Sequence, residues 1–190
     1  MENGKWKTDN LFDMQLSTFI CVCLCLIFLS ISALAQQGKD AKWESAGKQG
    51  VGTTFGLQSK IWFTLQGGSL TEVFYPTADN ANVQYLQFVV VNSKTKTVET
   101  ERDSAMHQVK FTDTNSLSFE QTNTTQNWEI RKTYAIDVER NSLLIDVQFS
   151  PKNKNLELYV FYNPSLKNSG MKDTAWTETL KNGEETLRSS

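Results

Sequence analysis

The 190-residue chain has the length of one domain, and its 39% hydrophobic and 21% charged residues are typical of a globular protein. Nineteen basic residues oppose twenty-one acidic ones, which gives a net charge of −2. Because the two signs are interspersed, the sequence lacks the concentrated positive charge with which proteins bind nucleic acid. We therefore expect a packed fold and no nucleic-acid partner.

The first 35 residues contain a long apolar run. Phe19–Leu29 is almost wholly apolar, and Ala33-Leu34-Ala35 offers the small residues that precede a signal-peptidase cut. This pattern predicts a signal peptide over residues 1–35, a mature chain that begins at Gln36, and a secreted, periplasmic or extracellular location. The alternative is an uncleaved anchor over Leu16–Ala35, since about twenty residues span a bilayer. A membrane contact is expected only during export or if the signal is uncleaved.

Few residues in the sequence are suited to binding a metal or a cofactor. Cys21, Cys23 and Cys25 all lie in the predicted signal segment, so the mature chain has no cysteine for a disulfide or a metal. The single histidine, His107, lies in an alternating stretch that is typical of a strand. The glycines between Gly47 and Gly56 match neither a phosphate loop nor a dinucleotide fingerprint. We expect no metal and no cofactor.

From residue 60 onward, apolar side chains alternate with polar ones, which is the pattern of β-strands. Polar turns separate the runs, including Gln66–Ser69 in a predicted hairpin and Pro76 at the end of a strand. Strands are expected over residues 60–65, 70–75, 84–91, 98–102, 106–112, 117–122, 128–137, 143–149 and 156–162. Some nine strands without a convincing helix predict an all-β, antiparallel β-sandwich.

Two of the predicted strands define the expected core. In the strand 128–137, four apolar residues share one face, and only Lys132 interrupts them. The run Tyr159–Tyr162 is apolar on both faces, so we expect it to be buried against a second sheet or another domain. After Pro164 the periodicity ends. We therefore assign residues 36–170 to the sandwich and interpret residues 171–190 as an incomplete or disordered end of a truncated domain.

Several motifs, taken in order, resemble the N-terminal domain of bacterial-type glucoamylases and glucodextranases, of glycoside hydrolase family 15. The resemblance covers about residues 43–170. It rests on Gly50–Thr54, Ile61–Leu65, Leu70–Asp79, Leu86–Val90, Lys132–Asp137, Leu144–Val147 and Leu158–Pro164.

The resemblance implies a β-sandwich of the galactose-mutarotase-like type, joined in that family to an (α/α)₆ barrel. The family hydrolyses α-glucosidic bonds of α-glucans from the non-reducing end with inversion, a reaction that needs two carboxyl groups roughly 6.5–9.5 Å apart. The family's two catalytic glutamates lie in the barrel. The resemblance therefore implies that this chain contains no catalytic residue, with the barrel as its partner and α-glucan as the substrate.

One loop has the residues for a contact with that barrel. We expect Tyr75, Asp79 and Asn80 to lie near the rim of the barrel's active site, with Tyr75 offering an apolar ring and a polar tip. The alternative is a plain turn in which Asp79 accepts backbone hydrogen bonds. A catalytic pair of Glu72 and Asp79 is a further hypothesis, but the sequence fixes no distance between them.

Two other functions are compatible with a sandwich. A stand-alone carbohydrate-binding module would stack exposed aromatic rings on sugar faces, and the candidates are Trp62, Trp128 and Trp176. A secreted structural or adhesion-type sandwich would use the same fold without binding any sugar. Binding of soluble glucans distinguishes these two hypotheses.

Overall fold

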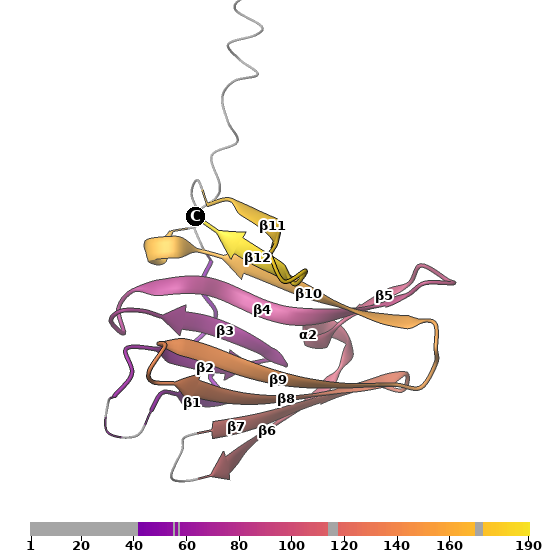
Figure 1. Cartoon of the computed structure of the whole chain (residues 1–190). Helices are drawn as coiled ribbons and strands as arrows, with labels where there is room; N and C mark the ends of the chain where they lie inside the picture. Colours follow the sequence, from indigo (N-terminus) through magenta and orange to yellow (C-terminus); the bar gives the residue numbers. More distant parts are fainter. Residues whose placement is uncertain (1–41, 55, 57, 114–117, 170–172) are drawn as a thin grey trace, which may run out of the picture. The chain divides into compact units, whose positions relative to one another are not determined.

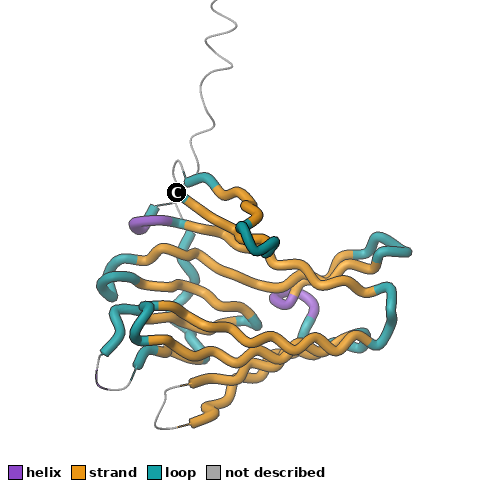
Figure 2. Tube along the Cα trace, viewed as in Figure 1, coloured by secondary structure: helices purple, strands orange, loops and turns teal. Residues whose placement is uncertain are grey.

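The computed structural model describes residues 42–54, 56, 58–113, 118–169 and 173–190. Two antiparallel β-sheets pack face to face in the compact unit that contains these residues (Figure 1). Strands make up most of the described chain, whereas helix is confined to two short segments (Figure 2). The predicted all-β sandwich is therefore confirmed, while the predicted signal peptide lies outside the described residues.

The first sheet is built around one long strand, β4 (Ala81–Asn92). Its strand order is β1-β2-β3-β4-β10, and β5 pairs with the second half of β4. The other members are β1 (Gly50–Gly52), β2 (Trp62–Gln66), β3 (Ser69–Phe74), β5 (Val98–Thr100) and β10 (Leu156–Pro164).

The second sheet is a simple meander in the order β6-β7-β8-β9. Its strands are β6 (Met106–Asp113), β7 (Ser118–Thr124), β8 (Trp128–Asp137) and β9 (Ser142–Pro151). One helical turn, α2 (Glu101–Ser104), connects the two sheets, and a 3₁₀ turn, η2 (Leu166–Asn168), follows β10. Among the described residues, no helix is long and apolar enough to cross a membrane.

The core lies between the two sheets, where large apolar side chains from both meet. Phe63 of β2 stacks on Tyr134 of β8 with ring centroids 5.7 Å apart, and it meets Phe119 of β7 edge-on at 6.2 Å. Further along the sandwich, Phe88 and Trp128 anchor a second cluster. These contacts bury the faces that the period-two pattern marked as apolar.

Lys132, the exception on the apolar face of β8, is fully buried together with Glu101 of α2. Its ammonium lies 2.8 Å from Glu101 Oε1 and donates a 2.7 Å hydrogen bond to the carbonyl oxygen of Gly68. The carboxylate also accepts hydrogen bonds from the Asn123 amide and the Phe88 backbone N–H. Burial lowers the pKa of Lys132, and the charge and hydrogen bond of Glu101 oppose that shift. The network ties α2 and the β2–β3 turn to the second sheet.

The β2–β3 turn consists of Gly67 and Gly68, both with positive φ, as a two-residue hairpin loop requires. At Gly68, where φ is +78°, a Cβ atom would also lie 2.5 Å from the ring of His107. His107 Nδ1 is in turn 3.3 Å from Asn123 Oδ1. The predicted hairpin is therefore confirmed, and glycine at position 68 is required both by the backbone and by the contact with β6.

The structure corrects two expectations about secondary structure. Residues 101 and 102 belong to α2 rather than to a strand, because Thr100 caps this turn by accepting a hydrogen bond from the Asp103 N–H. Residues 171–190, for which we predicted an incomplete or disordered end, form a hairpin in the part described, where β11 (Ala175–Thr179) pairs with β12 (Glu185–Ser189). The Asn-Gly pair at 182–183, which lies in the turn between these strands, is a hairpin signal that does not depend on an alternating pattern. The interpretation of this end as that of a truncated domain stays a prediction.

The apolar strand β10 does not have the burial that its sequence predicts. Tyr159, Val160 and Phe161 are 51%, 53% and 47% exposed. β10 is an edge strand of the first sheet, and none of the described elements covers this segment on both faces. Within the described structure no second sheet covers this segment, so its burial against another domain stays a prediction.

Candidate functional site

The loop between β3 and β4 brings the three predicted rim residues together. The Tyr75 N–H donates to the Asn80 carbonyl at 3.0 Å, and the Asn80 N–H donates to the Thr77 carbonyl at 3.1 Å, which closes a compact turn. The Tyr75–Pro76 peptide bond is cis, and the Tyr75 side chain is 43% exposed. The loop therefore has a fixed backbone and presents an aromatic ring to solvent.

The segment η2 holds this loop from the side. The Asn168 amide donates to the Asp79 carbonyl at 2.8 Å, and its oxygen accepts the Ala81 N–H at 2.6 Å. Lys167 and Asn168 have φ values of 55° and 61°, a left-handed conformation that costs roughly 1–2 kcal/mol for each such residue. The hydrogen bonds of Asn168 offset this strain. Strained non-glycine residues of this kind cluster at functional segments.

Asn82, at the start of β4, links the same two segments. Its side-chain nitrogen donates to the carbonyl of Tyr75 at 2.8 Å, while its side-chain oxygen accepts the Lys167 N–H at 3.1 Å. Neither Asn82 nor Asn168 was among the site residues predicted from the sequence. Both are asparagines next to a turn, a common pattern that carries little information without the fold.

The chemistry of Asp79 and Asn80 is modest. A hydrogen bond from the Thr77 hydroxyl, aided by the backbone N–H of Asp79, holds the pKa of the Asp79 carboxyl below its ordinary value. Asn80 Oδ1 is buried and has no hydrogen-bond partner within the described residues. An ionised, exposed carboxylate beside an exposed tyrosine suits a contact surface better than proton transfer.

Glu72 lies in a different setting on β3. Its carboxylate accepts hydrogen bonds of 2.6 Å from both Lys48 Nζ and Thr64 Oγ1, and one of 3.1 Å from the Glu44 N–H. Burial alone would raise the pKa of Glu72, but the hydrogen bonds from Lys48 and Thr64 outweigh burial and hold it below its ordinary value. Glu72 therefore attaches the segment 44–48 to the sheet.

The three tryptophans proposed for sugar stacking differ in exposure. Trp128 is completely buried in the core, and its indole nitrogen donates a 2.6 Å hydrogen bond to Glu99. It has no free ring face, so the stacking hypothesis fails for this residue. Trp62 is half-buried on β2, whereas Trp176 on β11 is 43% exposed. Trp176 remains a candidate.

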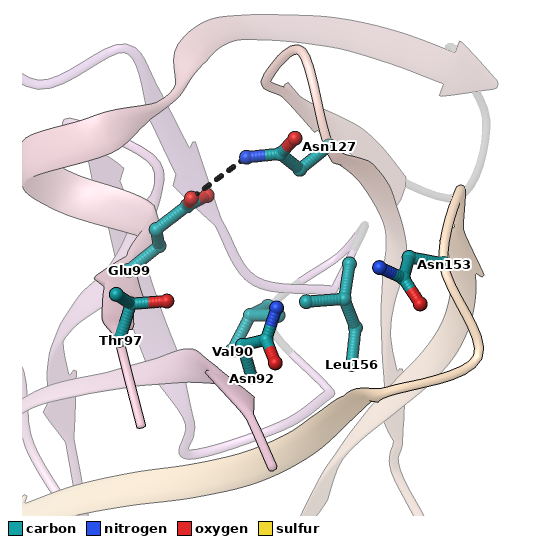
Figure 3. A pocket seen from close by; sticks show the side chains of 7 residues that line it. All are labelled: Val90, Asn92, Thr97, Glu99, Asn127, Asn153 and Leu156. Atoms are coloured by element: carbon teal, nitrogen blue, oxygen red, sulfur yellow. Dashed lines mark hydrogen bonds between the residues drawn. The ribbon is translucent and has the colours of Figure 1, made fainter. Parts of the chain in front are cut away.

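A polar pocket of about 80 Å³ lies at one end of the sandwich (Figure 3). The turns β4–β5, β7–β8 and β9–β10 meet there. Val90 and Leu156 provide its apolar wall, and the polar lining consists of Asn92, Thr97, Glu99, Asn127 and Asn153. These residues were not predicted, because they come from four separate stretches of the chain that only the fold brings together.

A more open pocket of about 260 Å³ lies between β1 and β6. Phe111, which is 53% exposed, packs its ring against Phe119 with centroids 4.3 Å apart. Across the pocket, Lys48 is already paired with Glu72. In the described ranges, no cluster of three or more His, Cys, Asp or Glu side chains is arranged to hold a metal ion.

Comparison with known proteins places this chain among glucoamylase-related sequences and structures. Residues 33–190 match the family model described as "Glucodextranase, domain N". A glucoamylase of Clostridium sp. (strain G0005) is 37% identical over 162 residues, which cover 83% of this chain and 23% of that protein. A crystal structure of a bacterial glucoamylase complexed with acarbose aligns with a TM-score of 0.74 at 34% identity, over 83% of this chain and 24% of that one. The chain thus spans about a quarter of the length of these relatives.

Proposed function

The chain belongs to the glucodextranase domain N family, and from this membership we propose that it is the non-catalytic N-terminal sandwich module of a secreted glucoamylase-type glycoside hydrolase. The enzyme would act on α-glucans in carbohydrate metabolism. Its partner would be an (α/α)₆ catalytic barrel, which lies outside this sequence. The observation that carries the proposal is the match of residues 33–190 to the domain N family, together with 37% identity to a glucoamylase.

The carboxylates of the described structure support a non-catalytic role. Inverting hydrolysis needs one carboxyl group that stays protonated to assist the leaving oxygen, and such a group has a raised pKa. Glu72 and Asp79 instead both have lowered pKa values. Glu72 is further engaged by Lys48 and Thr64. Neither residue has the raised pKa that the acid requires, which argues against the Glu72–Asp79 pair.

The loop Tyr75–Asn80 is the surface that we assign to the barrel contact. Asn168 and Asn82 fix its backbone, so Tyr75 is held out to solvent without the entropy loss of ordering a free loop. An exposed tyrosine on a rigid loop is a typical interface anchor. The signal segment over residues 1–35, if it acts as expected, would deliver the enzyme outside the cytoplasm.

A chimera tests the module assignment. This chain would replace the matching first quarter of the Clostridium glucoamylase, and glucose release from maltotetraose would be measured against the parent enzyme. We expect the chimera to retain activity, and Tyr75→Ala to reduce it without changing the unfolding midpoint. Leu144→Ala, which alters a comparably exposed apolar residue on β9, away from both this loop and the apolar segment of β10, is the matched control. A folded but inactive chimera would contradict the module assignment, and equal effects of the two substitutions would contradict the loop contact.

A stand-alone carbohydrate-binding module is the alternative, and the exposed Trp176 ring favours it. It predicts that the chain alone binds soluble starch or dextran, and that Trp176→Ala abolishes binding. Affinity electrophoresis in gels that contain each glucan would detect this interaction. Binding that Trp176→Ala leaves unchanged would count against this tryptophan as the stacking residue.

A further inference from the structure

The polar pocket in Figure 3 has a distinctive arrangement of hydrogen-bonding groups. Asn92 Oδ1 accepts the backbone N–H groups of Lys94 and Thr95, and Asn153 Oδ1 accepts that of Asn155. The oxygens of Asn92 and Asn153 are therefore used within their own turns. Their nitrogens have no protein acceptor among the described residues, and Figure 3 shows them on the pocket side of each amide. The pocket thus receives two amide donors.

Acceptors come from the opposite wall. Glu99 accepts one hydrogen bond at each oxygen, from Asn127 Nδ2 at 2.8 Å and from Trp128 Nε1 at 2.6 Å. Each carboxylate oxygen has a second lone pair available. Because the Trp128 ring is fully buried, its bond fixes the orientation of the carboxylate. The acceptor side of the pocket is therefore preorganised rather than free to rotate.

This combination selects the class of ligand. A cation would need several free oxygens, but both lone pairs of Asn92 Oδ1 are already used, and Asn92 and Asn153 turn their amide nitrogens toward the pocket. An anion would be repelled by Glu99. A neutral hydroxyl both donates and accepts, so adjacent hydroxyls can bind the amides and the carboxylate together, while Val90 and Leu156 contact the C–H groups between them. The volume of about 80 Å³ admits one edge of a sugar ring rather than a whole disaccharide.

We propose that this pocket binds the terminal glucose unit of an α-glucan chain through adjacent hydroxyl groups. The choice of glucose rests on the proposed role in α-glucan metabolism, whereas the preference for a neutral polyhydroxy ligand rests on the pocket alone. The pocket and the Tyr75 loop lie at opposite ends of β4, from Asn92 to Ala81, roughly 36 Å apart at 3.3 Å per residue. The module would thus hold glucan at one end and contact the barrel at the other.

The indole N–H of Trp128 is a built-in reporter, because it donates to the carboxylate that would bind the sugar. We would record ¹H–¹⁵N spectra of the full chain while adding maltose, isomaltose or glycerol. The expected result is a saturable shift of the Trp128 indole signal with maltose, with a dissociation constant on the order of 1 mM. Asn153→Ser removes the amide donor and keeps an oxygen for the turn, so it should weaken binding roughly fivefold to tenfold.

Asn155→Ser is the matched control, because it makes the same change in the same turn at a residue that does not line the pocket. It should leave the affinity unchanged. The proposal is overturned if maltose and isomaltose cause no saturable shift, if Asn153→Ser and Asn155→Ser behave alike, or if glycerol binds as tightly as maltose. The chimera measures glucose release instead, so a failure here and a failure of the module assignment are distinguishable.

Discussion

Replacing Lys132 by methionine tests the buried ion pair most directly. The ammonium lies 2.8 Å from a Glu101 oxygen, and both side chains are completely buried. Methionine matches the length of the lysine stem but leaves the carboxylate with hydrogen bonds from the Asn123 amide and the Phe88 N–H alone. Breaking a buried pair in this way costs about 3–5 kcal/mol, a large part of the 5–15 kcal/mol that is typical of a domain. We expect Lys132→Met to lower the free energy of unfolding by about 3–5 kcal/mol.

Urea unfolding followed by tryptophan fluorescence measures this loss. The double variant Lys132→Met/Glu101→Gln removes the uncompensated charge, so it should recover at least about 2 kcal/mol relative to the single variant. Two results would refute the reasoning. One is a single variant that loses less than about 1 kcal/mol, and the other is a double variant that is no more stable than the single one.

Three further predictions concern the hairpin turn, the β3 carboxylate and the η2 clamp. Gly68→Ala should destabilise the domain by about 2 kcal/mol or more, because φ is +78° and the new Cβ would meet His107; thermal unfolding detects this, and an unchanged midpoint would contradict it. Glu72→Gln should cost about 1–2 kcal/mol at pH 7. Because the pKa of Glu72 in the folded state lies below 4.5, the stability difference between the parent and Glu72→Gln should shrink as the pH falls below 4.5. Urea unfolding at several pH values measures this difference, and a difference that stays constant with pH would disprove the prediction. Asn168→Ala should speed proteolytic cleavage in the Tyr75–Asn80 loop while leaving cleavage elsewhere unchanged, since it removes the hydrogen bonds to Asp79 and Ala81.

The sheets could be predicted from local pattern because each strand face alternates with period two. For this reason, the predictions of the hairpin at Gly67-Gly68 and of the inward face of β8 were both correct. The burial of Lys132 could not be predicted from the alternation of apolar and polar residues. Its burial depends on Glu101, which is 31 residues away and lies on a helical turn too short to show a 3.6-residue period. A pairing of this kind follows from the fold and leaves no local signal.

The candidate site was predicted only in part. The Tyr75–Asn80 loop stood out through its Tyr-Pro pair, but Asn168 lies far along the chain and contacts the loop only in the folded sheet. The prediction of Trp128 as a stacking residue was wrong, because the alternating pattern of β8 places its side chain in the core, where the indole N–H donates to Glu99. The polar pocket was not predicted, because asparagines are common in turns and the sequence does not show that these three turns lie close together in the fold.

Glucose release by the full chain tests the central claim, that this module is not itself catalytic. The chain would be incubated with maltotetraose and with isomaltotetraose, and circular dichroism of the same preparation would verify the β-sheet fold. The account predicts a folded protein that releases no glucose above a buffer control. Release of glucose that Glu72→Gln or Asp79→Ala abolishes would contradict it, because the hydrolysis would then depend on carboxylates in this sandwich.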